Sequence, residues 1–175
     1  MTNLIKETKI RDNNNSYNVI VEIPKGTNKK YELNDPIFDR VISVRKVKGR
    51  YPYYYGCFPQ TFAGDKDPLD MILLTKQKYK SLDIVEVEIL GVIKTIDNNE
   101  VDDKIVVKPL NEKIDIERWK PKLFKFLKSY KGKNANTIID NTFYDKRVAE
   151  CLIAKANIEY KSKNNLKIKN NLKFY

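Results

Sequence analysis

Short runs of β-branched and apolar residues, separated by turn-forming residues, dominate the first two-thirds of the chain. Such runs are typical of strands. The stretch 51–68, "YPYYYGCFPQTFAGDKDP", is aromatic and interrupted by proline and glycine, so we expect a loop of fixed geometry there. Strands are expected at 17–23, 29–34, 37–44, 70–74, 83–96 (two strands or one bent strand) and 104–110.

The last third of the chain changes to a helical pattern. Apolar residues three or four apart predict a helix that contains Pro121 in its first turn and ends at Gly132. A second helix is expected over about 145–160, followed by a basic, mobile tail at about 161–175. Strands followed by helices predict a mainly β fold, a barrel-like core with about two flanking helices, in one domain spanning 1–175. The first helical stripe consists of Trp119, Leu123, Phe126, Leu127 and Tyr130.

Composition excludes several kinds of site. The chain has no histidine, which removes histidine bases and histidine-based zinc sites. Its two cysteines are too few for a disulfide framework, and we expect reduced thiols in a cytoplasmic protein. No signal peptide and no membrane span are expected. The formal net charge of +11 leaves nucleic-acid binding open as an alternative.

Three aspartates fall within six positions in "DKDPLD": Asp65, Asp67 and Asp70. Like charges this close oppose ionisation unless a proton or a cation joins them. Pro68 restricts Asp67 to an extended backbone, so the cluster is stiff. Oxygen ligands favour a hard cation such as Mg²⁺ or Mn²⁺. A calcium-binding EF-hand loop would need glycine and glutamate where Asp70 and Lys76 stand, and a solvated acidic turn is the remaining alternative.

A second acidic group, Asp97 and Asp102, precedes a strand, and Lys104 lies two residues beyond it. A hairpin could place this group beside the first cluster. Metal ions together with lysine, arginine and tyrosine are what a polyphosphate requires, because phosphoryl transfer depends mainly on positioning and charge neutralisation.

The segments "VEIPKG", "KYEL", "FDRVIS", "YPYYYGCFPQTFAGDKDPLDMILL", "GVIKTIDNNEVDDKIVV" and "SYKGK" resemble, in this order, the soluble family I inorganic pyrophosphatases. The resemblance covers about residues 17 to 133. It implies Mg²⁺-dependent hydrolysis of pyrophosphate to two orthophosphates, in an OB-like five-stranded barrel with flanking helices. Mn²⁺ or Zn²⁺ could substitute for Mg²⁺. The expected partner is the small molecule pyrophosphate, with no nucleic acid and no membrane, in a homo-oligomer for which a hexamer is favoured.

The resemblance also implies roles for single residues. Asp67 matches the general base. Glu32 and Tyr51 match supporting positions. The expected metal ligands are Asp65, Asp70, Asp97, Asp102 and Glu22. The expected substrate-binding residues are Lys30, Arg40, Tyr55, Lys104, Tyr130 and Lys131.

Some positions depart from the family pattern. The spacing between Arg40 and Tyr51 is about three residues longer than usual, which leaves Arg45 as the alternative arginine. After Gly132 the resemblance fades, and no functional residue is carried into the segment that follows. Two other functions stay open at this point: a single-stranded nucleic-acid-binding OB-like module, and a family member without catalytic activity.

Overall fold

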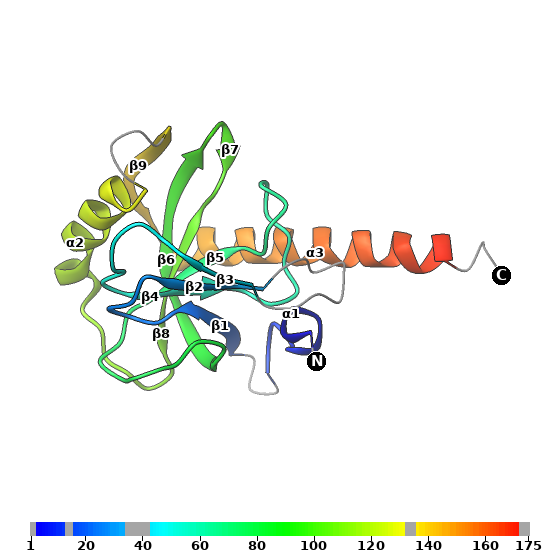
Figure 1. The fold of residues 1–175 in the computed structure, drawn as a ribbon, viewed down its shortest axis with the longest axis horizontal. Coiled ribbons are helices and arrows are strands. Elements are labelled where there is room, and N and C mark those ends of the chain that lie inside the picture. The colour runs from blue at the N-terminus through cyan, green and yellow to red at the C-terminus, as the bar shows by residue number, and fades with distance from the viewer. Residues whose placement is uncertain (1–2, 13–15, 34–42, 132–135, 172–175) are drawn as a thin grey trace.

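Five strands form a closed ring at the centre of the computed structural model (Figure 1), which describes residues 3–12, 16–33, 43–131 and 136–171. Neighbours in the ring are antiparallel except β5 and β8, which are parallel. The last strand pairs with the first and closes the barrel. The ring order is β1 (Tyr17–Ile23), β4 (Tyr54–Cys57), β5 (Asp70–Leu73), β8 (Lys104–Pro109) and β6 (Ile84–Asp97).

Strand β6 is a single strand of 14 residues. Its register with β8 shifts between Ile89 and Gly91, so one bent strand, not two, accounts for the long apolar run. Beyond the barrel its far end pairs with β7 (Glu100–Val101) on one edge and β9 (Thr137–Tyr144) on the other. The three strands project from the barrel as an arm, seen at the top of Figure 1.

Three strands, β4, β7 and β9, fall where the sequence did not indicate them. Strand β4 lies inside the stretch 51–68, so the expectation of a continuous loop there was wrong for these four residues. The neighbouring Pro52 and Pro59 suggested a loop, although all four residues are buried and pair with β5, and the last three also pair with β1. Strand β9 lies in the segment whose family resemblance had faded.

A separate hairpin of β2 (Lys29–Glu32) and β3 (Ser43–Lys46) lies beside the barrel. Most of the strand expected at 37–44 lies outside the described residues. Pairing places Lys30 opposite Arg45, which brings two cationic residues to the same part of the hairpin.

Helix α2 (Ile116–Ser129) confirms that the first expected helix exists, but it begins earlier than expected, so Pro121 lies inside the helix and not in its first turn. Asp115 caps the helix by accepting a hydrogen bond from Glu117 N at 3.2 Å. Helix α3 (Lys146–Asn171) begins where expected but continues to Asn171, through most of the segment expected as a tail. A short helix α1 (Leu4–Glu7) had not been expected. Among the described residues, no helix combines the length and the hydrophobicity needed to cross a membrane.

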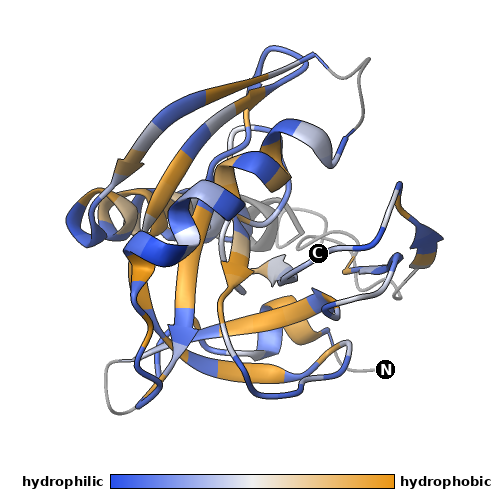
Figure 2. Cartoon of the chain, turned by 90° about the vertical axis from the view of Figure 1, so that its left-hand side faces the viewer, coloured by the Kyte–Doolittle hydropathy of each residue, from blue (hydrophilic) through white to orange (hydrophobic). Residues whose placement is uncertain are grey.

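The core consists of the barrel interior and two layers outside it. Figure 2 shows the hydrophobic positions along the strands and the hydrophilic ones on the outer faces of the helices. Ala149, Ile153 and Ala156 of α3 pack into the same cluster as the barrel residues Val87 and Val107. The apolar stripe of α2 packs instead on a second cluster that includes tyrosines of the 51–55 segment. Since the two clusters take alternate residues of β5 and β8, the two helices pack toward opposite faces of these strands.

Candidate active site

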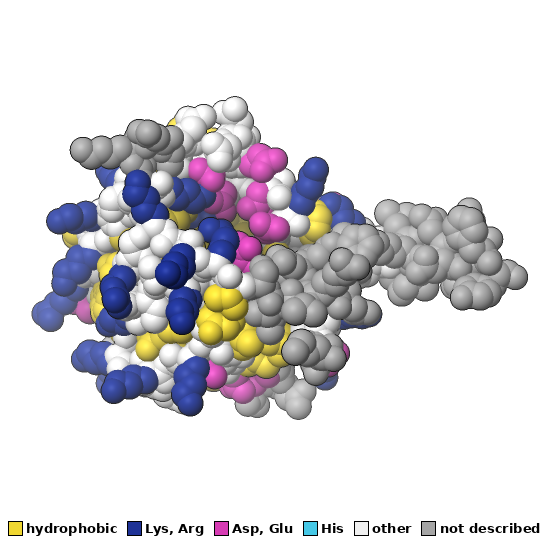
Figure 3. All heavy atoms as spheres, in the orientation of Figure 1, with side chains coloured by type: hydrophobic (Ala, Val, Ile, Leu, Met, Phe, Trp, Pro, Cys, Tyr) yellow, Lys and Arg dark blue, Asp and Glu magenta, His cyan; other side chains and the backbone are white. Residues whose placement is uncertain are grey.

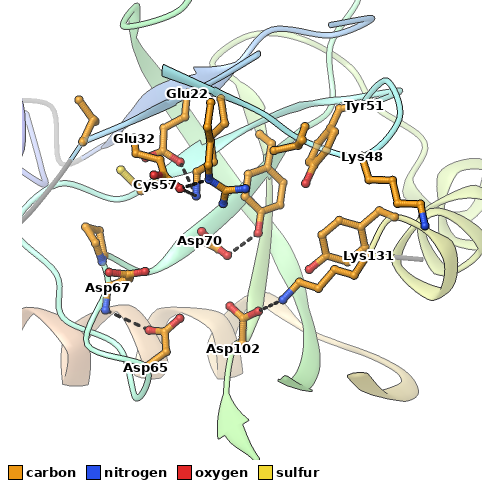
Figure 4. Close-up of a pocket in the computed structure, with 17 residues that line it drawn as sticks. Glu22, Glu32, Lys48, Tyr51, Cys57, Asp65, Asp67, Asp70, Asp102 and Lys131 are labelled. Carbon is orange, nitrogen blue, oxygen red and sulfur yellow. Dashed lines mark hydrogen bonds and ion pairs between the residues drawn. The ribbon is translucent and has the colours of Figure 1, made fainter. Parts of the chain in front are cut away.

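A cavity of about 490 Å³ lies between the β2–β3 hairpin, the barrel strands, the β4–β5 loop and the end of α2 (Figure 4). Six carboxylates and four basic side chains are among its described lining residues, which leaves a formal excess of two negative charges when all are ionised. Figure 3 shows acidic side chains gathered in one patch on a face otherwise rich in Lys and Arg. The lining residues are Glu22, Lys30, Glu32, Leu33, Arg45, Val47, Lys48, Tyr51, Tyr55, Cys57, Asp65, Asp67, Pro68, Asp70, Asp102, Tyr130 and Lys131.

The turn at Ala63–Asp67, here called the aspartate loop, presents two of these carboxylates. Ala63 N donates to the Asp67 carbonyl at 2.8 Å, and Lys66 N donates to the Ala63 carbonyl at 3.1 Å. Asp67 N donates to Asp65 Oδ1 at 3.1 Å. Lys66, with φ of 70°, takes the left-handed conformation that closes the turn. The last bond holds the Asp65 carboxylate, the backbone bonds hold the turn, and both carboxylates point toward the cavity (Figure 4).

Alternating carboxylates and lysines form one continuous chain at the base of the site. Lys104 Nζ, fully buried, donates to Asp70 Oδ2 at 2.6 Å and also to Asp102 Oδ1. Lys131 Nζ donates to Asp102 Oδ2 at 3.1 Å and to Asp97 Oδ2. This series of ion pairs thus joins residues from β5, β8, the β7–β8 connection, the end of α2 and the end of β6.

The two lysines decide how these carboxylates ionise. Burial by itself would raise the pKa of Asp70, but Lys104 and Lys30 outweigh it and leave the pKa lowered. For Asp102, burial prevails and its pKa is raised. Burial would lower the pKa of Lys104, yet Asp70 and Asp102 raise it, so the ammonium stays charged. The base of the site is therefore ionic, although it is shielded from water.

The aspartate loop behaves differently, because neither of its carboxylates forms an ion pair with a lysine among the residues that the structure describes, and the attraction of Lys30 for Asp67 does not outweigh burial. Loss of hydration raises the pKa of Asp65 and of Asp67, and the charge of Asp70 raises both further. A carboxylate of raised pKa is a better proton acceptor than an ordinary one.

Basic side chains of the hairpin face the carboxylates across the cavity. Lys30 Nζ lies 3.7 Å from Glu22 and 3.9 Å from Glu32, and Arg45 forms an ion pair with Glu32. Burial raises the pKa of Glu22 to about 7, with Asp70 adding to the shift. Lys48 also lines the cavity, on the side of Tyr51 and Lys131 (Figure 4).

Three tyrosines form the wall beside these cations. The rings of Tyr55 and Tyr130 both pack edge-on against that of Tyr51. Tyr55 Oη donates to Asp70, and burial raises the pKa of all three, that of Tyr51 to about 12. They therefore remain neutral donors at physiological pH. Tyr130 Oη is buried and has no hydrogen-bond partner among the described residues, so a donor is left for a ligand.

The donor set suits a divalent cation. Within the described part of the chain, no three acidic or thiol groups are arranged to hold a metal as they stand, because Lys104 and Lys131 lie between the carboxylates. All candidate ligands are carboxylate oxygens, which match a hard cation, and the excess negative charge of the cavity requires one before any polyanion can enter.

A model of the inorganic pyrophosphatase family matches residues 19–161. The chain belongs to this family. It is 32% identical over 155 residues to the inorganic pyrophosphatase of Nanoarchaeum equitans, a match that covers 81% of this chain and 95% of that protein. It is 40% identical over 100 residues to the inorganic pyrophosphatase of Neisseria meningitidis serogroup A, where the match spans only about half of each protein, 55%.

Solved structures of the pyrophosphatase family share the fold. The inorganic pyrophosphatase from Neisseria gonorrhoeae superimposes with a TM-score of 0.75 at 26% identity, over 90% of this chain and 99% of that one. The expected resemblance to family I pyrophosphatases and the OB-like five-stranded barrel are therefore confirmed.

Most residues that the pyrophosphatase resemblance selected come together in space. Asp97 and Lys104 do not line the cavity, but ion pairs join them to the residues that do. Arg40 lies outside the described residues, and its role stays a prediction. The residues that line the cavity as expected are Glu22, Lys30, Tyr55, Asp65, Asp67, Asp70, Asp102, Tyr130 and Lys131.

Three residues that belong to this site had no role in the sequence analysis. Lys48 had been taken as part of a turn, and only the folding of the hairpin brings it to the cavity. Cys57 lines the cavity from β4, where burial raises the pKa of its thiol. Thr137 Oγ1 of β9 donates to Asp97 Oδ1 at 2.7 Å. No motif signals Thr137, because it lies where the resemblance had faded.

Proposed function

We propose that this protein hydrolyses inorganic pyrophosphate to two orthophosphates. The observation that carries the proposal is the cavity, in which a carboxylate cluster faces lysines and tyrosines, in a chain of the pyrophosphatase family. The Nanoarchaeum equitans relative, matched over nearly its whole length, is named an inorganic pyrophosphatase.

We propose Mg²⁺ as the cation, held by carboxylates in three groups. Asp65, Asp70 and Asp102 would hold the tightest ion, and Asp70 would share a second. Asp97 and Asp102 would hold an ion that enters with substrate, with Glu22 at the edge of the site. When bound, the ions neutralise phosphate oxygens and increase the acidity of water.

The residues of the chain supply the proton acceptor and the phosphate contacts. Asp67 would take the proton from the attacking water, helped by its raised pKa. Lys30 and Lys131 would neutralise phosphate oxygens at opposite sides of the cavity, and Tyr55 and Tyr130 would donate hydrogen bonds without adding charge.

The arginine of the site has two candidates. Arg45 lines the cavity and is paired with Glu32. Arg40 remains the choice of the sequence resemblance. Separate Arg40→Lys and Arg45→Lys variants would distinguish the two, because lysine keeps the charge but loses the paired hydrogen bonds of the guanidinium.

The test is orthophosphate release from pyrophosphate, with and without Mg²⁺, for the wild type and for Asp67→Asn. We expect Mg²⁺-dependent release that falls by about 10²- to 10⁴-fold in the variant. Glu100→Gln, an exposed carboxylate on β7, is the matched control and should retain full activity. Folded, Mg²⁺-saturated wild type that releases no orthophosphate would overturn the proposed function, while unchanged release by the variant would overturn the role of Asp67.

A cytoplasmic location and a homo-oligomeric assembly are further parts of this proposal. Both cysteines are free, which agrees with a reducing cytoplasm. The proposal of a homo-oligomer, with a hexamer favoured, rests on the family resemblance. Light scattering coupled to gel filtration measures the number of subunits directly.

A further inference from the structure

A second cavity, of about 360 Å³, lies behind the aspartate loop. The segment leading to the loop, the loop itself, the β7–β8 segment and one face of helix α3 form its walls. In Figure 1 this region lies where the β4–β5 connection passes between β7 and α3. Its lining residues are Phe62, Ala63, Gly64, Lys66, Leu69, Val101, Asp103, Leu152, Lys155, Ala156, Glu159 and Lys163.

The aspartate loop is the shared wall of the two cavities. Asp65 and Asp67 line the first cavity, whereas Lys66 between them lines the second. Lys66 is also the residue in the left-handed conformation, which a non-glycine residue adopts at a cost. A ligand that contacts Lys66 would therefore act on the residue that sets the direction of both aspartates.

Helix α3 forms the opposite wall and is bonded directly to the segment that precedes the loop. Phe62 N donates to the Ala156 carbonyl at 3.0 Å, and Asn157 Nδ2 donates to the Gln60 carbonyl at 2.6 Å. The spacing between helix and loop is thus fixed at one end by these bonds. Nearer to the aspartates, the helix and the loop are separated by the second cavity.

The lining indicates the chemical class of ligand. Phe62, Leu69, Val101 and Leu152 offer apolar walls that suit a compact hydrocarbon or aromatic body. Val101 is 54% exposed although it is large and apolar, so this wall has no complete cover from the described residues.

Charge at the rim favours an anion. Three lysines and two acidic residues line the cavity, a formal charge of +1. Lys163 is already engaged, lying 3.5 Å from Glu159 and over the ring of Phe62. Asp103 accepts a hydrogen bond from Thr95 N at 3.0 Å. Lys66 and Lys155 form no ion pair among the residues that the structure describes, so their ammonium groups are available to a ligand.

We propose that this second cavity binds a small molecule with a compact apolar body and a single anionic group, and that its occupancy changes cation binding by the aspartate loop. The binding part of the proposal does not depend on catalysis. The coupling part rests on the proposed function of the first cavity, because it takes Asp65 as a cation ligand and Asp67 as its neighbour in the loop.

The probe is 8-anilinonaphthalene-1-sulfonate, an aromatic monoanion whose fluorescence rises in apolar surroundings. We expect saturable binding by the native protein that weakens about tenfold in Lys155→Glu, which reverses one of the two available charges of the rim. Leu152→Trp, which fills the cavity, should abolish binding by a route independent of charge. Lys161→Glu, on the same helix but outside the cavity, is the matched control and should bind as the wild type does. Circular dichroism verifies that each variant is folded.

Two comparisons identify the site and the ligand class. Orthophosphate, which the first cavity would take, should not displace the probe. The uncharged analogue N-phenyl-1-naphthylamine should bind more weakly than the sulfonate. Displacement by orthophosphate, or equal affinity of both probes, would overturn the assignment.

Coupling is measured without any hydrolysis, by titrating the probe with and without saturating Mg²⁺. Because coupling between two sites is reciprocal, a change of about fivefold in probe affinity requires the same change in Mg²⁺ affinity. Equal probe affinity in both conditions would overturn the coupling while leaving the binding site in place. Since neither measurement uses pyrophosphate, a failure here is separate from a failure of the proposed activity.

Discussion

Replacing Lys104 with methionine should weaken the folded state more than any other single change at the base of the candidate site. Methionine preserves most of the side-chain volume, so the variant removes the charge without leaving a large void. The ammonium is fully buried and bonds to both Asp70 and Asp102. Its loss leaves two shielded carboxylates beside each other, and among the described residues Tyr55 still donates to Asp70 and Lys131 to Asp102.

The expected size follows from the contacts. At 2.6 Å from Asp70 the ion pair is worth about 6 kcal/mol at an effective dielectric constant of about 20. The burial of all three groups opposes that attraction in the wild type, so the measured loss is smaller than the sum of the pairs. Removal of one partner from a buried pair typically costs about 3–5 kcal/mol, and we expect the free energy of unfolding to fall by this amount.

The loss of unfolding free energy in Lys104→Met should depend on pH, in a direction that follows from the pKa of Asp70. In the wild type the folded-state pKa of Asp70 is lowered, so its contribution to stability is present above its unfolded pKa and is lost as pH falls through the folded value. Without Lys104, burial dominates and raises that pKa. The variant then gains stability on protonation, and its deficit should be largest near about pH 8 and smaller near about pH 5.

Urea unfolding followed by fluorescence of Trp119 measures the free energy for both proteins. Lys108→Met is the control, because its ion pair with Glu88, at 2.7 Å, is partly exposed and should contribute only about 0–1 kcal/mol. Mg²⁺ should restore part of the loss in Lys104→Met, since a cation that binds only the folded state stabilises it. A deficit below about 1 kcal/mol at neutral pH, or one that grows on acidification, would refute the ionic account of the site.

Three further predictions follow from the structure. Gly56→Ala should destabilise the protein by about 3 kcal/mol or more in urea unfolding, because a Cβ there would lie 1.9 Å from a backbone oxygen of β1. Thr137→Val should weaken Mg²⁺ binding about fivefold in calorimetric titration, because Asp97 loses the hydrogen bond that orients it. Thr137→Ser should retain the wild-type affinity. In native protein at mildly alkaline pH, iodoacetamide should modify the exposed Cys151 rapidly, while Cys57, buried and with a raised pKa, should react only after unfolding.

Each of these has a clear contrary result. A Gly56→Ala protein as stable as wild type would mean that β4 can move away from β1 without cost. Equal Mg²⁺ affinity for the valine and serine variants at Thr137 would show that the hydroxyl does not position Asp97. Early modification of Cys57, detected by peptide mass spectrometry, would show that the wall of the candidate site opens readily.

The sequence predicted those parts of the fold whose pattern is local. The β-branched run at Tyr17–Ile23 and the helical stripe of α2 were placed correctly, because apolar periodicity reports burial directly. Strand β4 was missed, since its glycine and the prolines that flank it suggest a loop when pairing on both edges is not known. The helical continuation of α3 beyond residue 160 was also missed, because its lysines and asparagines carry no apolar stripe.

The residues of the candidate site also fall into those that a local sequence pattern identifies and those that it does not. Asp65, Asp67 and Asp70 could be selected because they are crowded in one short segment with a family signature. Thr137 and Lys48 could not, because each reaches the site only through pairing with a distant strand. Local sequence also gave no sign that Lys104 would be fully buried between two aspartates.

The parallel pairing of β5 with β8 has a consequence for how the protein is made. Asp70 and Lys104 stand one residue before the paired positions Met71 and Ile105, and they are 34 residues apart in the chain. During synthesis Asp65, Asp67 and Asp70 are made before Lys104 and Lys131, and contacts between distant segments form slowly. The nascent chain therefore carries three unpaired carboxylates for some time, and only completion of the barrel turns them into an ordered site.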